Sequence, residues 1–176
     1  MNRAGTIKAV SKFHKLSICD GLEALATRNY NTAFPFHFHR TYNISLVYEG
    51  VFRTKVRERS LYAPTGAILI TNPLEVHSNP CESNERISFF TFYVNPEFIN
   101  HYTKQTLVFC DNIIYDDELF KKLHEIAIQI ENEGGAGTIE DQLTPALHNL
   151  FSRHAFSSDG KDNLSSHHSL FTDYLA

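Results

Sequence analysis

The sequence has no apolar run of bilayer length and no apolar stretch near its N-terminus. A transmembrane helix needs about 20 consecutive apolar residues, and a secretory signal needs an apolar core of roughly 7–15, so neither is expected. Cysteine is scarce: Cys19, Cys81 and Cys110 are odd in number and have no C-x-x-C spacing. We therefore expect reduced thiols, as found in the cytoplasm, and no disulfide framework.

An excess of positive charge is also missing. Sixteen Lys and Arg stand against 20 Asp and Glu, which gives a net charge of −4. Phosphate contacts need a clustered cationic face, so these 176 residues are not expected to bind nucleic acid themselves. One basic run alternates with Phe52, Thr54 and Val56, which predicts a strand with one wet and one buried face. It consists of Arg53, Lys55, Arg57 and Arg59.

The most informative stretch runs from Phe36 to His77. His37 and His39 are two residues apart, so both lie on one side of an extended strand. Glycine, proline and asparagine divide the residues that follow into short β-branched and aromatic runs. Several short strands at this spacing predict a sandwich or barrel, and the three imidazoles of His37, His39 and His77 are expected to meet inside it.

This stretch resembles the two motifs of the cupin small-barrel superfamily. In the first motif, His-x-His is followed after three residues by Glu and then by Gly; here Asn43 replaces the Glu, and Gly50 fits. In the second motif, Gly is followed eleven residues later by His, as Gly66 is by His77. The expected Pro-x-Gly between them is absent.

With these two differences from the cupin motifs, the stretch resembles one branch of that superfamily, the sensor domains of AraC-type transcriptional regulators. The shared order continues with a Pro-containing turn, Glu-Val-His and a late apolar strand, and it covers roughly residues 20 to 155. It is carried by His37, His39, Tyr42, Gly50, Gly66, Pro73, Glu75, Val76, His77 and FFTFYVNPEFI. The resemblance implies a cupin-like jelly-roll barrel over residues 21–115. It also implies that residues 1–20 form an arm that closes over ligand through Phe13, His14 and Leu16, although a disordered tail is an equal alternative.

After residue 115 the apolar period changes to that of helices, and residues 116–156 are expected to form an antiparallel pair. Gly134-Gly135 separates the two helices, and Thr138 and Asp141 are candidate N-caps of the second. Pro145 predicts a kink there or a restart at Thr144. We expect the apolar stripes to pair two copies of the chain rather than to pack within it, through Leu119, Leu123, Ile126, Ile130, Leu143, Leu147 and Leu150.

Residues 157–176 begin with polar linker composition and become apolar again at Leu170 and Phe171. In AraC-type proteins, a helix-turn-helix domain begins after such a linker. The chain is therefore expected to be the sensor half of a regulator, although a natural C-terminal helix is the alternative.

Three roles remain open for the histidines. The alternatives are to line a small-molecule pocket, to hold a metal ion, or to serve only as structural hydrogen-bonding groups. We prefer the pocket, without a metal, cofactor or catalytic residue, because Asn43 removes the anionic ligand of the cupin site. The predicted ligand-binding residues are His37, His39, Asn43, Ser45 and His77, and strand parity adds Val47, Phe52, Thr54, Val56, Ile68 and Ile70 to the interior.

The sequence thus predicts the effector-binding and dimerisation domain of a bacterial, cytoplasmic AraC-type regulator. Its expected partners are a small-molecule effector, a second copy of itself, and DNA only through a further C-terminal domain. The alternative is a small metal-dependent cupin enzyme, such as a dioxygenase or isomerase.

Overall fold

The computed structural model describes residues 8–81 and 85–158. Strands come first along the chain and helices follow, as the change of period predicts. The described elements are β1 (Val10–Lys15), β2 (Glu23–Tyr30), β3 (Phe34–His37), β4 (Tyr42–Glu49), β5 (Val51–Val56), β6 (Arg59–Pro64), β7 (Ile68–Thr71), β8 (His77–Asn79), β9 (Ile87–Val94), α1 (Pro96–Thr103), β10 (Leu107–Val108), β11 (Ile113–Ile114), α2 (Asp117–Glu131), α3 (Ala136–His154) and β12 (Phe156–Ser157).

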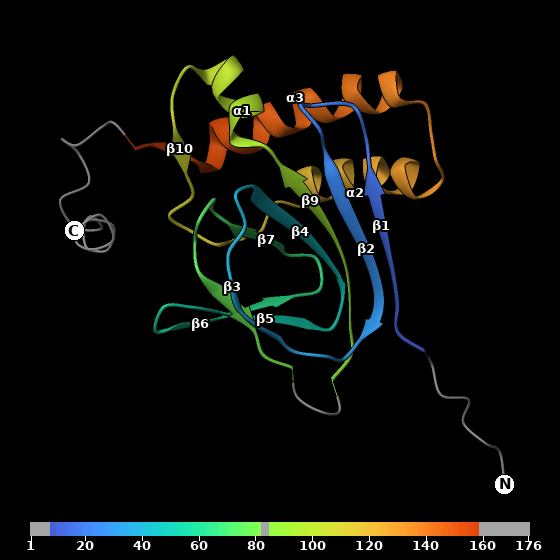
Figure 1. Cartoon of the computed structure of the whole chain (residues 1–176), viewed down its shortest axis with the longest axis vertical. Helices are drawn as coiled ribbons and strands as arrows, with labels where there is room; N and C mark the ends of the chain where they lie inside the picture. The colour runs from blue at the N-terminus through green and yellow to red at the C-terminus, as the bar shows by residue number, and fades with distance from the viewer. Residues whose placement is uncertain (1–7, 82–84, 159–176) are drawn as a thin grey trace, which may run out of the picture.

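Two antiparallel sheets form the barrel (Figure 1). The larger has the order β1-β2-β9-β4-β7-β11, and the smaller has the order β3-β8-β5-β6. Between them lies an apolar cluster that includes Val47 of β4, Phe52 of β5 and Phe89 of β9. The predicted mainly β barrel with C-terminal helices is confirmed.

Strand β4 is buried on both of its faces from Tyr42 to Val47. Side chains alternate along a strand, so Asn43 and Ser45 face the smaller sheet whereas Ile44 and Leu46 face the opposite way. Both faces of the larger sheet are therefore covered. The alternation of Asn43 and Ser45 with Ile44 and Leu46 therefore separates a cavity face from an apolar face rather than an exposed face from a buried one.

Helices α2 and α3 cover the outer face of the larger sheet (Figure 1). This packing corrects the predicted dimer interface, because the sheet carries a second apolar face that the helices must bury. The seven side chains assigned to that interface are only 0–2% exposed within the single chain, so they have no surface left for a partner. They are Leu119, Leu123, Ile126, Ile130, Leu143, Leu147 and Leu150.

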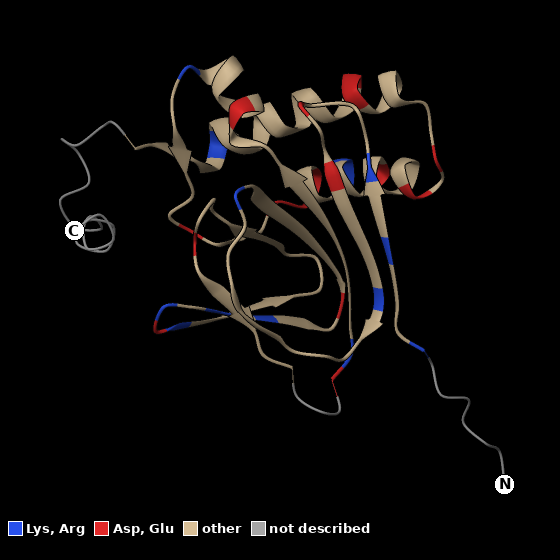
Figure 2. Cartoon of the chain, in the orientation of Figure 1, with Lys and Arg blue, Asp and Glu red and all other residues tan. Residues whose placement is uncertain are grey.

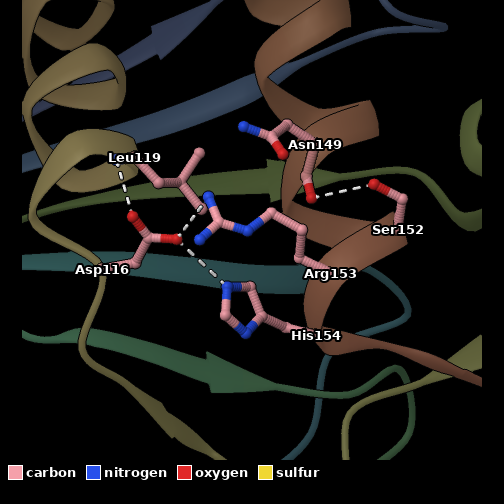
Figure 3. Close-up of polar contacts among 6 residues, drawn as sticks. All are labelled: Asp116, Leu119, Asn149, Ser152, Arg153 and His154. Carbon is pink, nitrogen blue, oxygen red and sulfur yellow. Dashed lines mark hydrogen bonds and ion pairs between the residues drawn. The ribbon is translucent and has the colours of Figure 1, made fainter.

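Asp116 ties the beginning of α2 to the end of α3 (Figure 3). Its Oδ1 accepts the backbone N–H of Leu119 at 3.1 Å, which caps α2. Its Oδ2 lies 2.9 Å from Arg153 Nη1 and 3.2 Å from His154 Nε2. Burial alone would raise the pKa of Asp116, but these partners outweigh it and lower the pKa, so the carboxylate stays ionised.

Pro145 lies inside a continuous α3, and neither the predicted restart at Thr144 nor caps at Thr138 or Asp141 occur; Gly135 is the N-cap. Proline in a helix interior costs about 3 kcal/mol because it removes one hydrogen bond. Its neighbours Leu143, Ala146 and Leu147 are fully buried in the core, and that packing holds the helix together across the proline.

Residues 10–15 of the predicted arm form β1, which pairs in register with β2 at the edge of the larger sheet. Because side chains alternate along a strand, the three residues expected to form a lid do not share one face of the sheet. His14 and Leu16 turn toward the helix-side core, and only Phe13 lies on the barrel side, with its ring 6.4 Å from that of Tyr93. None of the three lines the cavity described below.

The basic run lies on the β5–β6 hairpin, where Figure 2 shows Lys and Arg outside the barrel. Phe52, Thr54 and Val56 are buried, as the alternation predicts. Arg53 makes a bidentate ion pair with Glu85, at 2.8 and 2.6 Å. Among the described residues, no helix is long and apolar enough to cross a bilayer.

Candidate ligand-binding pocket

A cavity of about 250 Å³ lies between the two sheets. Its size is just below the range of about 300–1,000 Å³ that is typical for drug-sized ligands, so it suits a small metabolite. Most of the wall is apolar or aromatic, with a few polar groups. It is lined by Leu25, Phe34, Pro35, His37, His39, Asn43, Ser45, Phe52, Leu69, Thr71, His77, Asn79, Phe89, Thr91 and Tyr93.

The three histidines meet at one end of the cavity. The ring centroid of His37 lies 4.9 Å from that of His39 and 4.4 Å from that of His77. One ring nitrogen from each histidine lies within 4.8 Å of the other two. Strand geometry explains this, because His37 of β3 is directly opposite His77 of β8 and His39 follows on the same side.

Backbone carbonyls fix two of the rings. Nδ1 of His37 lies 2.6 Å from the carbonyl oxygen of Pro35, and Nδ1 of His77 lies 2.8 Å from that of Glu75. A carbonyl oxygen only accepts, so each Nδ1 carries the proton and Nε2 of the neutral ring keeps its lone pair.

His39 and His77 are both neutral at pH 7. Burial, with a smaller contribution from His37 and His77, lowers the pKa of His39 to about 4. Burial is also the main cause that lowers the pKa of His77. The histidine end of the cavity therefore offers neutral hydrogen-bonding groups rather than positive charge.

The polar groups on β4 and β9 form a second region of the wall. The hydroxyls of Ser45 and Thr91 are 2.7 Å apart, and Asn43 Oδ1 accepts the Thr41 hydroxyl at 3.1 Å. Burial, followed by the charge of Glu23, raises the pKa of Tyr93 to about 12, so its phenol is protonated. No Asp, Glu, Lys or Arg is among the described residues that line the cavity.

The structure brings all five predicted ligand-binding residues to this cavity: His37, His39, Asn43, Ser45 and His77. The parity assigned to β7 is wrong, because Leu69 and Thr71 face the cavity while Ile68 and Ile70 pack toward the helices. Ile68, Leu69 and Ile70 are all apolar, so the sequence does not distinguish the two faces of this strand. The pairing of β7 with β4, which places Leu69 opposite Ser45, decides it.

Sequence reasoning missed Thr91 and Tyr93 of β9. They alternate with Phe90 and Phe92, but three of these four residues are buried and Tyr93 is half-buried, so periodicity does not show which pair faces the cavity. The pairing of Asn43 with Tyr93 and of Ser45 with Thr91 decides it. That pairing joins strands more than 40 residues apart, and no local sequence signal identifies it.

A two-sheet barrel enclosing a small cavity without charged side chains defines a ligand-binding barrel domain. The sequence matches the profile of the AraC-like ligand binding domain over residues 21–148. The chain therefore belongs to the AraC-like ligand-binding domain family, and the resemblance inferred from the motifs is confirmed. None of the curated proteins matches the sequence significantly.

Three solved structures are similar to the chain at low identity, and the first of them shares its fold. The AraC-like transcriptional activator CuxR is similar with a TM-score of 0.63 and 10% identity, over 90% of this chain and 63% of CuxR. A cupin-like protein from Thermotoga maritima has a TM-score of 0.41 and 12% identity, over 56% of this chain and 82% of its own. A cupin-2 domain protein from Shewanella frigidimarina has a TM-score of 0.38 and 15% identity, over 42% and 71%.

Proposed function

We propose that the chain is the sensor domain of a cytoplasmic, bacterial AraC-type regulator, and that its barrel binds a small uncharged effector. The observation that carries this proposal is the cavity itself, which combines an apolar wall with three histidines at one end and no formal charge. An ionised ligand would lose its hydration there without a counter-charge, at a cost of several kcal/mol. A neutral ligand with a hydrogen-bonding end and an apolar body loses little.

The proposed effector binds without being transformed. No carboxylate or cysteine is among the described residues of the wall, and the Ser45 hydroxyl bonds to Thr91 rather than to a histidine. A nucleophile or general acid–base pair needs hydrogen-bond contact between its members. Ligand binding would instead alter how the barrel is presented to a DNA-binding domain elsewhere in the regulator.

Thermal unfolding with matched pairs of small compounds tests the proposal. An amide and its parent carboxylate of equal size form one such pair, and a sugar and its aldonate form another. We expect the neutral member to raise the unfolding midpoint, since saturation at 100 times Kd stabilises a protein by about 2.7 kcal/mol. Ser45→Leu, which fills the cavity, is expected to abolish the shift. Preference for the anionic member, or equal shifts in Ser45→Leu, would contradict the proposal.

The histidine cluster also supports a second candidate, a transition-metal site in a cupin enzyme. Three imidazoles with one ring nitrogen each within 4.8 Å of the others match the donor set of Zn²⁺ or Fe²⁺, and carbonyls hold Nδ1 of two of the rings. Such an ion would be held by His37, His39 and His77 and would polarise a bound oxygen ligand. Asn43 supplies no negative charge to compensate it, which favours the metal-free sensor.

Metal analysis separates the two candidates. We expect protein purified without added metal to contain far less than one transition metal ion per chain, and His77→Ala to leave that content unchanged. One equivalent of metal in the native protein, lost in His77→Ala, would favour the metal site.

A homodimer through the helices also remains part of the proposal, with its interface moved to the exposed ridge of α2. Lys121, Glu125 and Ile128 follow one another at helical spacing on that ridge, and Ile128 is 42% exposed. Two antiparallel copies of the ridge, related by a two-fold axis that passes near Ile128, would bring the isoleucines of the two copies together. We expect light scattering to show a dimer, and Ile128→Glu to give a folded monomer. A native chain that is already monomeric would remove this part of the proposal.

A further inference from the structure

A second cavity lies on the helical side of the molecule, away from the histidines. It is a groove of about 270 Å³ between α1 and the second half of α3. Its floor consists of buried apolar side chains, and its rim is formed by the exposed residues Tyr102, Pro145 and His148. The floor is formed by Phe98, Ile99 and Phe151.

The last described residue, Ser158, lies beside the segment that follows α1. After α3, strand β12 pairs with β10, which places Ser157 opposite Leu107 and Phe156 opposite Val108. The backbone N–H of Ser158 then donates to the carbonyl of Thr106 at 2.9 Å. Thr106 follows α1 by three residues, and Thr103 at the end of α1 is one wall of the groove.

The residues beyond Ser158 have a composition that fits the groove. Leu170, Phe171, Tyr174 and Leu175 are spaced as one face of a helix. An amphipathic segment of this kind binds an apolar groove through residues one turn apart. Twelve residues separate Ser158 from Phe171, and at about 3.3 Å per extended residue the tether is long enough to allow the segment to turn back.

We infer that the groove between α1 and α3 is the docking site of the chain's own residues 168–176. A short tether supplies an effective concentration in the millimolar range, which a second copy or a separate protein reaches only at very high concentration. The occupant is thus favoured by attachment as well as by its apolar side chains.

Docking there gives the barrel a physical connection to whatever follows the segment. Strand β9 contributes Thr91 and Tyr93 to the histidine-lined cavity and continues through Asn95, the N-cap of α1, into Phe98 and Ile99 of the groove. The two cavities share one continuous stretch of chain. The docking site itself is independent of what the barrel binds, so its test does not require the effector.

Photo-crosslinking tests the inference on the full 176-residue chain. Tyr102 is 56% exposed, so p-benzoylphenylalanine at this position is expected to leave the fold intact. We expect irradiation to join residue 102 to the tryptic peptide of residues 162–176 within the same chain. The matched control carries the photo-reactive residue at Tyr62, which is 53% exposed on β6, and is expected to give no such product.

Two further measurements make the result decisive. Phe171→Asp is expected to lower the crosslink yield roughly tenfold, whereas Leu164→Asp, outside the apolar face, is expected to leave it unchanged. Mixing isotope-labelled with unlabelled protein separates links within a chain from links between chains. Links only between chains, the absence of a link to residues 162–176, or an undiminished yield in Phe171→Asp would each overturn the inference.

Discussion

Leu123→Ala is expected to lower the free energy of unfolding by about 2–5 kcal/mol. Leu123 lies at the centre of α2, is 0% exposed, and belongs to the core that joins the helices to the larger sheet. Truncation removes its contacts and leaves a cavity that the sheet and α3 cannot fill. Urea denaturation followed by circular dichroism measures the loss as a lower midpoint with an unchanged slope.

Leu74→Ala, the same change outside the helices, is the matched control. Leu74 is 62% exposed, so its truncation is expected to change the free energy of unfolding by less than about 1 kcal/mol. If the two variants behaved alike, or if Leu123→Ala changed the oligomeric state without lowering stability, the assignment of the inner helix face to the core would be wrong.

The second large effect concerns the ligand. For a compound that stabilises the native protein, His39→Ala is expected to weaken binding by about 1–3 kcal/mol, or roughly 5- to 150-fold in Kd. His39 is neutral and enclosed near His37 and His77, so its ring offers one donor and one acceptor to the ligand. His77→Ala is expected to act in the same direction. Isothermal titration calorimetry measures both affinities.

His101→Ala is the control for a general effect of losing a histidine, because His101 is exposed on α1 and does not line the cavity. Its affinity is expected to equal that of the native protein. His77 is buried, so the stability of its variant is measured alongside the affinity. Unchanged affinity in both His39→Ala and His77→Ala would show that the histidines are structural.

The half of the site on β3, β4 and β8 was predictable because its information is local. A His-x-His pair fixes two side chains on one strand face, and counting in twos from them reaches Asn43 and Ser45 correctly. Parity failed on β7, where Ile68, Leu69 and Ile70 are all apolar and only the pairing with β4 selects the face. On β9, parity does not decide which residues face the cavity, because both faces of the strand are covered. Only the pairing with β4 selects Thr91 and Tyr93.

The helices show a different limit of sequence reasoning. Their apolar stripes were identified correctly, but the surface that buries them was not, because a barrel was assumed to have one apolar face. The uninterrupted burial of β4 and β9 gives the larger sheet a second one. A stripe shows that a helix face must be covered, whereas only the packing of the whole chain shows what covers it.

The central claim is that the histidine-lined cavity of the barrel is the effector site. Amide NMR spectra of the isotope-labelled chain, recorded while a stabilising neutral compound is added, test it most directly. The account predicts shifts concentrated at His39, Asn43, His77 and Thr91, with saturation at one ligand per chain. Shifts concentrated instead at Phe98, Tyr102 and Leu147 would place the ligand in the groove between α1 and α3 and contradict the claim.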